Sequence, residues 1–266
     1  MTDQVIVTEN LVKIHYSHFL RRPSRALQGV SFSIARGEAF GLLGPNGAGK
    51  TTTQKLLLGL LKPTEGTVCV LGHPAGDPRA LDKVGFLPEN PYFYSYLTAH
   101  EFLDFFGRLF NLSAAQRKER ANELLKMVSL SDAGSKPIRK FSKGMLQRLG
   151  IAQALMNDPD VLFLDEPNTG LDPIGRRDIR NIIKGLKQQG KTIFLNSHLL
   201  PDVNELCDRI MILHRGRCAA EARVQDIATS GNYRDLEEYF MDAVARAEQE
   251  YNEQQATAAA ATPAKV

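Results

Sequence analysis

Residues 39–57 read AFGLLGPNGAGKTTTQKLL and determine the fold. Residues 44–51 match the pattern G-x-x-x-x-G-K-[ST], in which glycines let successive backbone N–H groups turn inward around a phosphate. The apolar residues 39–43 predict a buried strand, and the apolar spacing over residues 50–61 predicts a helix that ends before Lys62 and Pro63. This order is the one that a phosphate-binding loop requires, because the positive end of the helix then faces the anion.

The loop predicts a set of phosphate and metal contacts. Lys50 is expected to reach the β and γ phosphates of a nucleotide, and the Thr51 hydroxyl to bind Mg²⁺. The residues expected to surround the phosphates are Gly44, Pro45, Asn46, Gly47, Ala48, Gly49, Lys50, Thr51 and Thr52.

An acidic pair follows a second apolar run at residues 161–166, VLFLDE. A continuous apolar run is typical of a parallel strand that is buried on both faces. Open α/β sheets bind ligands at the carboxyl ends of their strands, so Asp165 and Glu166 should lie at the same edge as the phosphate loop. We expect Asp165 to hold the metal directly or through water, and Glu166 to orient and deprotonate a water in line with the γ phosphate.

The remaining pattern predicts an α/β fold: a P-loop NTPase core with a mixed, mainly parallel sheet, plus an inserted α-helical subdomain. Strand patterns occupy the first third of the chain and return at residues 161–164 and 192–195. Between them, Thr98 with Glu101 and Ser113 with Gln116 predict capping boxes of two helices, and Ser142 predicts the N-cap of a third. The expected parts are a core from 1–89 and 157–231, a helical subdomain at 90–156, a C-terminal helix at 232–253 and a disordered Ala-rich tail at 254–266.

Composition restricts the class of protein. The 266 residues carry a net charge of only +3 without a basic run, which argues against nucleic acid as a partner. No apolar stretch reaches the ~18 residues of a membrane span, so a membrane role would require another subunit. The three cysteines, Cys69, Cys207 and Cys218, lack metal-ligand spacing and cannot all pair. They favour a reducing, intracellular compartment, with the thiols as small core residues.

A series of motifs, in the family's order, resembles those of the ATPase subunits of ATP-binding cassette (ABC) transporters, over about residues 5 to 230. Residues 141–145, FSKGM, stand at the position of the family signature LSGGQ and are followed by LQR. Residues 169–172, TGLD, stand at the D-loop position, and His198 stands at the switch histidine. Residues 84–88, VGFLP, lead into the Q-loop position. The phosphate loop and the acidic pair occur where the family has them, and the subgroup most similar in these motifs is the bacterial export type.

The resemblance implies ATP and Mg²⁺ as ligands and a head-to-tail dimer with a second copy or a homologous ATPase subunit. Ser142 and Gly144 would then contact ATP bound to the partner, Asp172 would cross the interface, and His198 would contact the γ phosphate. Tyr16 stands where the family stacks an aromatic ring on adenine, although His15 and Phe19 are alternatives and core packing is another role for Tyr16.

Two positions depart from the family pattern. Glu89 replaces the Q-loop glutamine; its carboxylate is expected to reach Mg²⁺, directly or through water, while adding negative charge beside the phosphates. Lys143 replaces the first signature glycine and either contacts nucleotide or points to solvent. Gly144 retains the close backbone approach to phosphate.

The leading hypothesis is an ATP hydrolase that powers export through a separate transmembrane permease, at the cytoplasmic face of the plasma membrane. The alternatives are the ATPase of an importer, a soluble ABC ATPase that acts on ribosomes or DNA, and a small-molecule phosphotransferase. The last explains neither the signature nor His198. The C-terminal helix is expected to pack on the core, and a regulatory or dimer-supporting role for it stays open.

Overall fold

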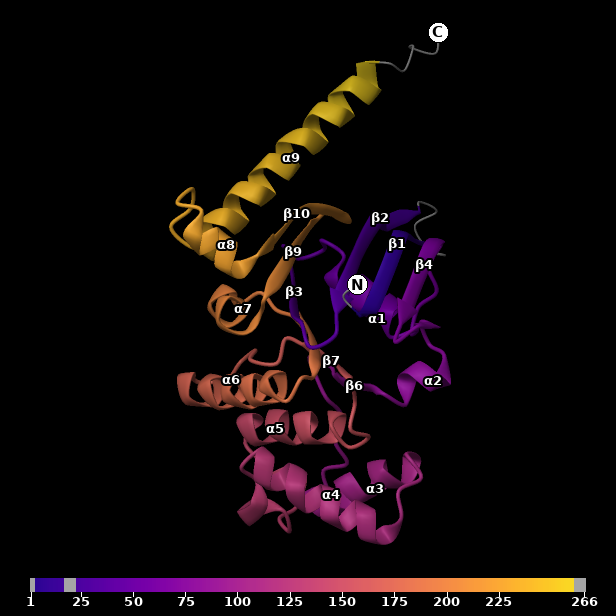
Figure 1. Ribbon diagram of the computed structural model, residues 1–266, viewed down its shortest axis with the longest axis vertical. Coiled ribbons are helices and arrows are strands. Elements are labelled where there is room, and N and C mark those ends of the chain that lie inside the picture. Colours follow the sequence, from indigo (N-terminus) through magenta and orange to yellow (C-terminus); the bar gives the residue numbers. More distant parts are fainter. Residues whose placement is uncertain (1–2, 17–22, 261–266) are drawn as a thin grey trace.

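The computed structural model describes residues 3–16 and 23–260. Phe19, one of the alternatives to Tyr16, lies outside these ranges, as do residues 261–266 of the predicted tail. Two sheets form the body of the molecule, and a group of helices extends from one end of it (Figure 1).

The larger sheet has six strands in the order β10-β9-β3-β8-β7-β6. Its five strands from β9 to β6 are parallel, and β10 pairs antiparallel with β9. The mixed, mainly parallel sheet of the sequence prediction is therefore confirmed. The strands span Ala39–Leu43 (β3), Val84–Leu87 (β6), Val161–Asp165 (β7), Thr192–Asn196 (β8), Arg209–His214 (β9) and Arg217–Arg223 (β10).

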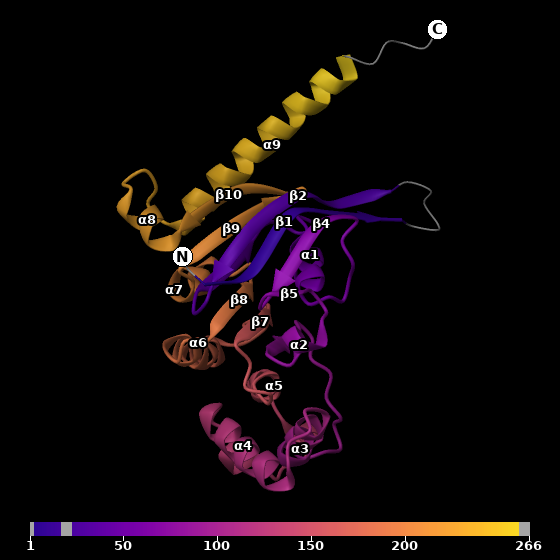
Figure 2. The same ribbon diagram turned by 45° about the vertical axis from the view of Figure 1, so that its right-hand side comes forward.

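The smaller sheet is antiparallel, with the strand order β2-β1-β4-β5. It packs over one face of the larger sheet, and its long strands β1 and β2 lie beside each other in Figure 2. The strand patterns of the first third indicate β1, β2 and β4 individually, but they do not show that these strands form a separate layer, and they do not indicate β5. The strands span Gln4–His15 (β1), Ser24–Ala35 (β2), Glu65–Val70 (β4) and His73–Pro74 (β5).

Apolar residues of the central strands alternate between two cores. Leu162 and Leu164 of β7 face the core on the helical side, while Phe163 faces the core beneath the antiparallel sheet. In that second core Phe194 lies between Phe40 and Phe163, with ring centroids 6.1 and 5.3 Å away. Burial on both faces explains why these strands are continuous apolar runs, and it fixes where their carboxyl ends stand.

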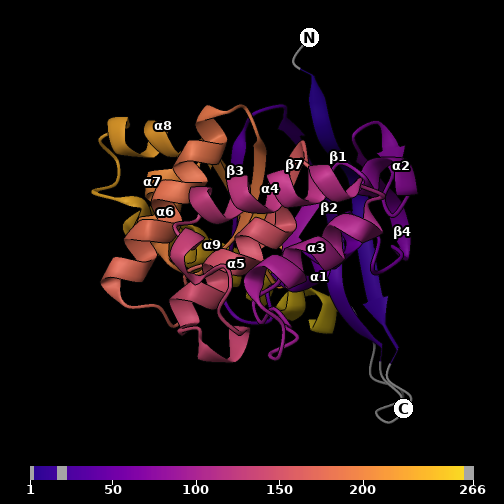
Figure 3. The same cartoon turned by 90° about the horizontal axis from the view of Figure 1, so that it is seen from below.

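Helices cover both faces of the larger sheet. On the side of the second core, α1 follows the phosphate loop. The segments of the inserted region are stacked beyond the sheet, below it in Figure 1 and nearest the viewer in Figure 3. Bounds in the core are Lys50–Leu57 (α1), Pro78–Leu81 (α2), Pro173–Gln188 (α6), Leu200–Leu206 (α7) and Val224–Thr229 (α8). Bounds in the inserted region are Ala99–Leu109 (α3), Ala114–Met127 (α4), Ser131–Ala133 (η1), Ile138–Lys140 (η2) and Lys143–Ala154 (α5).

Local helix signals are confirmed at the starts of the inserted helices. Thr98 and Ser113 both form complete capping boxes, and the Ser142 hydroxyl accepts a hydrogen bond from Met145 N. The inserted region is not packed as a separate body, since its apolar residues belong to the same buried cluster as one face of the larger sheet. Gly150 of α5 lies so close to Leu87 of β6 that a Cβ there would be 2.6 Å from the leucine side chain.

Two helices have boundaries that differ from the sequence prediction. Helix α1 ends at Leu57, not Leu61, because Gly59 takes a left-handed conformation (φ 70°), the usual C-terminal stop. Helix α9 spans Leu236–Ala260, so it begins four residues after the predicted start at residue 232, and the prediction of disorder is wrong for residues 254–260. Alanine has the highest helix propensity, and an Ala-rich segment attached to a formed helix continues it.

The expectation that all three thiols are core residues is wrong for one of them. All three cysteines are free; Cys207 is buried, Cys69 is half-buried and Cys218 is exposed. Cys218 lies on β10, the edge strand of the larger sheet, which only β9 pairs with. No helix in the described part of the chain combines the length and apolarity that crossing a bilayer requires.

Candidate active site

The loop between β3 and α1 is held against neighbouring backbone on two sides. A Cβ at Gly44 would collide with the carbonyl oxygen of Leu213, and one at Gly49 would lie 2.7 Å from that of Ala26. Both glycines also have positive φ, 151° and 111°. Glycine is required at these positions because only a residue without a side chain fits both the space and the backbone angle.

Lys50 folds back over its own loop. Its ammonium donates to the carbonyl oxygens of Gly44 at 2.7 Å and Pro45 at 3.3 Å. Burial lowers the pKa of Lys50, and the nearby carboxylates of Glu166 and Asp165 act in the opposite direction. The ammonium is thus positioned inside a turn whose following helix begins at Lys50 itself, where phosphate oxygens are favoured.

Asp165 ends β7 and is almost fully buried, with 8% of its surface exposed. Its Oδ1 accepts a 2.6 Å hydrogen bond from Asn196 Nδ2, at the equivalent end of β8. Burial is the main reason that the pKa of Asp165 is raised to about 6; the Asn196 bond lowers it, and the charges of Glu166 and Glu89 raise it. The Asn196 amide also lies 3.4 Å from Gln54 Oε1, and the buried atoms Gln54 Nε2 and Asn196 Oδ1 have no protein partner.

Glu166 and His198 form a directly bonded pair. Glu166 Oε2 lies 2.7 Å from His198 Nδ1, and it also accepts hydrogen bonds from His198 N at 3.4 Å and Thr169 Oγ1 at 3.2 Å. Glu166 adopts a left-handed backbone conformation with φ 50°. A carboxylate oriented in this way by an imidazole has the arrangement of a general base for a bound water.

The donor chemistry at this edge fits Mg²⁺. Thr51, Asp165 and Glu89 offer only oxygen atoms, the ligands that this ion prefers. No group of three or more His, Cys, Asp or Glu side chains in the described ranges is arranged to hold a metal ion. Mg²⁺ in nucleotide sites is usually bound by one or two protein groups together with phosphate oxygens, which agrees with this set.

A single cavity of about 570 Å³ brings most of the predicted residues together. Those that line it are Gly44, Pro45, Asn46, Lys50, Thr51, Glu89, Asp165, Glu166 and His198. The predicted residues that do not line it are Tyr16, Gly47, Ala48, Gly49, Thr52, Ser142, Gly144 and Asp172. Of these, Tyr16 is 73% exposed, so it is free of the core packing that was its alternative role.

Five residues that line this cavity were not predicted from the sequence. They are Leu43, Asn196, Ser197, Leu200 and Phe240. The same argument that placed Asp165 at a strand end applies to Asn196, so this residue was accessible to sequence reasoning. Phe240 comes from α9 and carried no local signal.

Residues 143–144 of the signature segment lie next to residues 170–171 of the D-loop, and none of these four residues lines the cavity. Thr169, at the start of the D-loop, is bonded to the cavity residue Glu166. The Lys143 ammonium occupies the place that a Cβ of Gly170 would take, so Lys143 lies over the D-loop of its own chain. Asp172 caps α6 by accepting a 2.7 Å hydrogen bond from Gly175 N.

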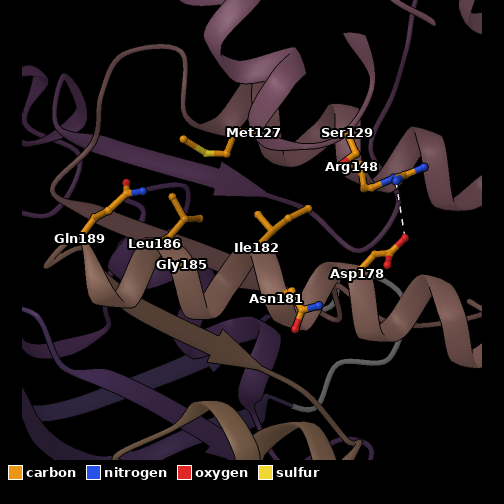
Figure 4. Close-up of a pocket in the computed structure, with 9 residues that line it drawn as sticks. All are labelled: Met127, Ser129, Arg148, Asp178, Asn181, Ile182, Gly185, Leu186 and Gln189. Atoms are coloured by element: carbon orange, nitrogen blue, oxygen red, sulfur yellow. Dashed lines mark ion pairs between the residues drawn. The ribbon is translucent and has the colours of Figure 1, made fainter. Parts of the chain in front are cut away.

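The helices that follow these two segments are also joined. Figure 4 shows a second cavity, of about 340 Å³, beside α6, where Arg148 of α5 and Asp178 of α6 form an ion pair at 3.6 Å. The signature helix and the D-loop helix are therefore held together as one unit by contacts within the chain.

The fold and cavity together define a nucleoside triphosphatase of the P-loop class. Residues 27–169 match the family model for ABC transporters. An ABC transporter ATP-binding protein of Nostoc sp. is 49% identical over 87% of this chain and 70% of its own length. The Nod factor export ATP-binding protein I of Ralstonia nicotianae is 41% identical, with coverages of 81% and 68%. A fluoroquinolones export ATP-binding protein of Mycobacterium tuberculosis is 44% identical, with coverages of 73% and 64%.

Solved structures agree with these relatives. The ATP-binding subunit of an ABC transporter has a TM-score of 0.78 and 31% identity, over 90% of this chain and 99% of that one. A dimeric cassette in a post-hydrolysis state with ADP and Pi has a TM-score of 0.74 and 28% identity, over 82% and 98%. The chain belongs to the ABC transporter family and is an ATP-hydrolysing, ATP-binding subunit of that family.

Proposed function

We propose that this chain energises export through a separate transmembrane permease, working as a head-to-tail pair with ATP and Mg²⁺ between the two copies. Relatives named for Nod factor export, fluoroquinolone export and linearmycin resistance support export as the direction of transport. The dimeric cassettes among the similar solved structures support the pair.

The observation that carries this proposal is the separation of the two anion-binding helix starts within one chain. The start of α1 lies at the cavity, whereas Ser142 and Gly144 at the start of α5 do not line it. A helix start with exposed N–H groups favours phosphate. In a two-fold pair, each chain supplies its signature segment to the other chain's cavity. Such a pair uses both helix starts, that of α1 and that of α5, to bind phosphate.

The proposed reaction uses the Glu166–His198 pair. A water attacks the γ phosphorus, Glu166 accepts the proton of that water, and ADP leaves as the β–γ bridging bond breaks. His198 holds the Glu166 carboxylate in place from one side. Thr51, Asp165 and Glu89 are the side chains proposed to hold Mg²⁺, which supplies charge neutralisation at the phosphates when bound.

The proposed docking site for the permease is an aromatic surface on the helical subdomain, formed by Tyr92, Tyr94, Tyr96 and Phe105. Tyr92 and Tyr96 are 83% and 69% exposed, and the ring of Tyr94 lies 5.7 Å from that of Phe105. Beside them is a groove of about 860 Å³. Exposed aromatic clusters of this kind are typical of protein interfaces.

This surface is connected to the ATP cavity along the chain. It begins three residues after Glu89, a cavity residue, and continues into α3. Movement of Glu89 on closure around nucleotide would therefore reach the permease directly, which is the coupling that transport requires. The location that follows is the cytoplasmic face of the membrane, through the permease.

Copurification tests the permease proposal. A tagged chain, extracted from its native membranes in mild detergent, should bring down a multi-span membrane protein. The double variant Tyr94→Ala/Tyr96→Ala should reduce that recovery about tenfold, since interface aromatics are common hot spots. Leu60→Ala, which removes a 62% exposed side chain elsewhere, is the control.

Other outcomes of this experiment contradict the proposal. Ribosomes or DNA in the eluate, without a membrane protein, would favour a soluble ABC ATPase. A soluble substrate-binding protein recovered with the permease would favour import. Equal recovery with the double variant would remove the aromatic surface as the docking site.

A further inference from the structure

Helix α9 reaches the ATP cavity although it lies far along the chain from every motif. It begins beside α7, α8 and the β9–β10 hairpin, and its far end extends away from the body (Figures 1 and 2). It also lies outside residues 27–169, which match the family model.

The first contact is made by Phe240, which lines the cavity together with His198 and Leu200. Leu236 and Ala243, one turn on either side of Phe240, are 4% and 1% exposed. This spacing directs one face of α9 into the body and fixes the direction of the Phe240 ring. Phe240 therefore lies in the same cavity as the Glu166–His198 pair.

The second contact is made by Glu248, two turns further along α9. Its carboxylate accepts hydrogen bonds from Arg215 Nε and Nη2, both at 2.8 Å, and lies 2.6 Å from His214 Nε2. The guanidinium of Arg215 also lies over the Tyr251 ring, 4.4 Å from its centroid. The hydrogen bonds from Arg215, followed by that from His214, lower the pKa of Glu248 to about 2, so the carboxylate is ionised at neutral pH.

The hairpin turn that Glu248 holds is itself in contact with the phosphate loop. Gly216 N donates a 2.9 Å hydrogen bond to Ala48 O, and Leu213 O lies directly against Gly44. Glu248 is therefore connected to the loop around Lys50 through one intervening turn.

We propose that α9 is a built-in part of the nucleotide site. Phe240 closes the cavity on the side of the Glu166–His198 pair and positions the loop that carries His198. Glu248 holds the β9–β10 turn against the phosphate loop. Neither side chain takes part in the chemistry. Both are positioning residues. The proposal rests on the assignment of the chain as an ATPase and not on its permease or its direction of transport.

Fluorescence gives a direct test, because the chain contains no tryptophan. Phe240→Trp places a single reporter at the cavity, and Met241→Trp places one on the next residue, which is 61% exposed. Saturating ATP should change the emission of Trp in the first variant and leave the second unchanged. A flat response of Phe240→Trp, in protein shown by filter binding to hold ATP, overturns the cavity placement without touching the ATPase assignment.

Steady-state kinetics test the positioning roles. Phe240→Ala should lower kcat about tenfold with little change in KM. A misplaced loop around His198 affects the reacting groups more than it affects ATP binding. Phe240→Leu should recover most of that loss, and Met241→Ala should match the parent. Glu248→Gln should raise KM for ATP about threefold at unchanged kcat, with Glu237→Gln, an exposed carboxylate of the same helix, as its control.

These variants also separate positioning from general destabilisation. If Phe240→Ala does not fold, Phe240→Leu and the fluorescence variant still decide the matter. A Phe240→Ala protein with kcat within twofold of Met241→Ala overturns the role of Phe240. A Glu248→Gln protein whose KM equals that of Glu237→Gln overturns the role of Glu248.

Discussion

The phosphate loop and the signature segment are both turns that contain glycine and open a helix, yet their surroundings differ. The first is packed against Ala26 and Leu213, with Lys50 folded over it and two carboxylates nearby. In the second, Ser142 and Lys143 are exposed, and the atom nearest to a Cβ on Gly144 would be Leu171 Cδ2 at 4.0 Å. One site is already built within the chain, whereas the other has space in front of it.

Under the proposed pairing, this difference assigns nucleotide binding to one chain and completion of the site to its partner. A loop that is complete by itself binds nucleotide in the isolated protomer. A helix start with open space before it acquires its ligand only when something else approaches. In a two-fold pair that ligand is the nucleotide held by the partner, so binding and dimerisation become one event.

The largest expected effect comes from Glu166→Gln, which leaves both phosphate sites intact and removes the proposed base. Hydrolysis should fall by about a thousandfold, the scale of general base catalysis, while ATP-dependent dimers accumulate. Phosphate release and size-exclusion chromatography with ATP measure the two effects. Turnover at the parent rate would exclude Glu166 as the base.

Lys50→Ala tests the phosphate loop, the site that is complete within one chain. Affinity for ATP should fall about 100-fold, because charge-assisted hydrogen bonds to phosphate are lost. Titration calorimetry measures it, and Lys55→Ala, an exposed lysine on the same helix, is the control. Unchanged affinity in Lys50→Ala would contradict the phosphate-loop assignment.

Gly144→Asp tests the signature segment, which has open space in front of it. The space around Gly144 within the chain accommodates a side chain, so the melting temperature and the ATP affinity of the protomer should match the parent. Turnover should fall at least about tenfold, because a carboxylate would meet the partner's phosphates. A fully active variant would show that this segment never meets nucleotide.

Mixing the last two variants sharpens the result. A Lys50→Ala chain has an intact signature and a Gly144→Asp chain has an intact loop, so a mixed pair contains one complete composite site. Trapping of one ATP per pair by the mixture, and of none by the Gly144→Asp chain alone, is the expected outcome. Equal trapping in both samples would place the whole site within one chain.

The smallest effect concerns Asp165, whose pKa is raised to about 6. Between the ordinary carboxyl pKa and 6 the native protein binds more protons than the unfolded chain, so this group adds stability as the pH falls and loses it as the pH rises through 6. Without nucleotide, the melting temperature of the parent should rise by a few degrees relative to Asp165→Asn between pH 7 and pH 5. A constant difference would contradict the raised pKa.

Features set by local sequence were predictable. The capping boxes at Thr98 and Ser113 are decided within four residues, and the buried run before Asp165 identifies its strand and its end. The grouping of Lys50, Asp165, Glu166 and His198 followed from a general rule on where parallel strands end.

Features set by long-range packing were not predictable. The separate antiparallel layer depends on pairing between β1 and β4, which are far apart in sequence. Phe240 reaches the cavity only because Leu236 and Ala243 attach α9 to the body. The position of Lys143 over Gly170 likewise needs the packing of α5 on α6.

The left-handed backbone of Glu166 has a consequence for any effort to make this protein more robust. A non-glycine residue at φ 50° costs roughly 1 kcal/mol, which glycine at the same position does not incur. A library of variants selected for heat resistance should therefore enrich Gly at residue 166. The selected proteins would unfold at higher temperatures but would no longer hydrolyse ATP. At this single backbone angle, thermal stability and ATP hydrolysis make opposite demands on the residue.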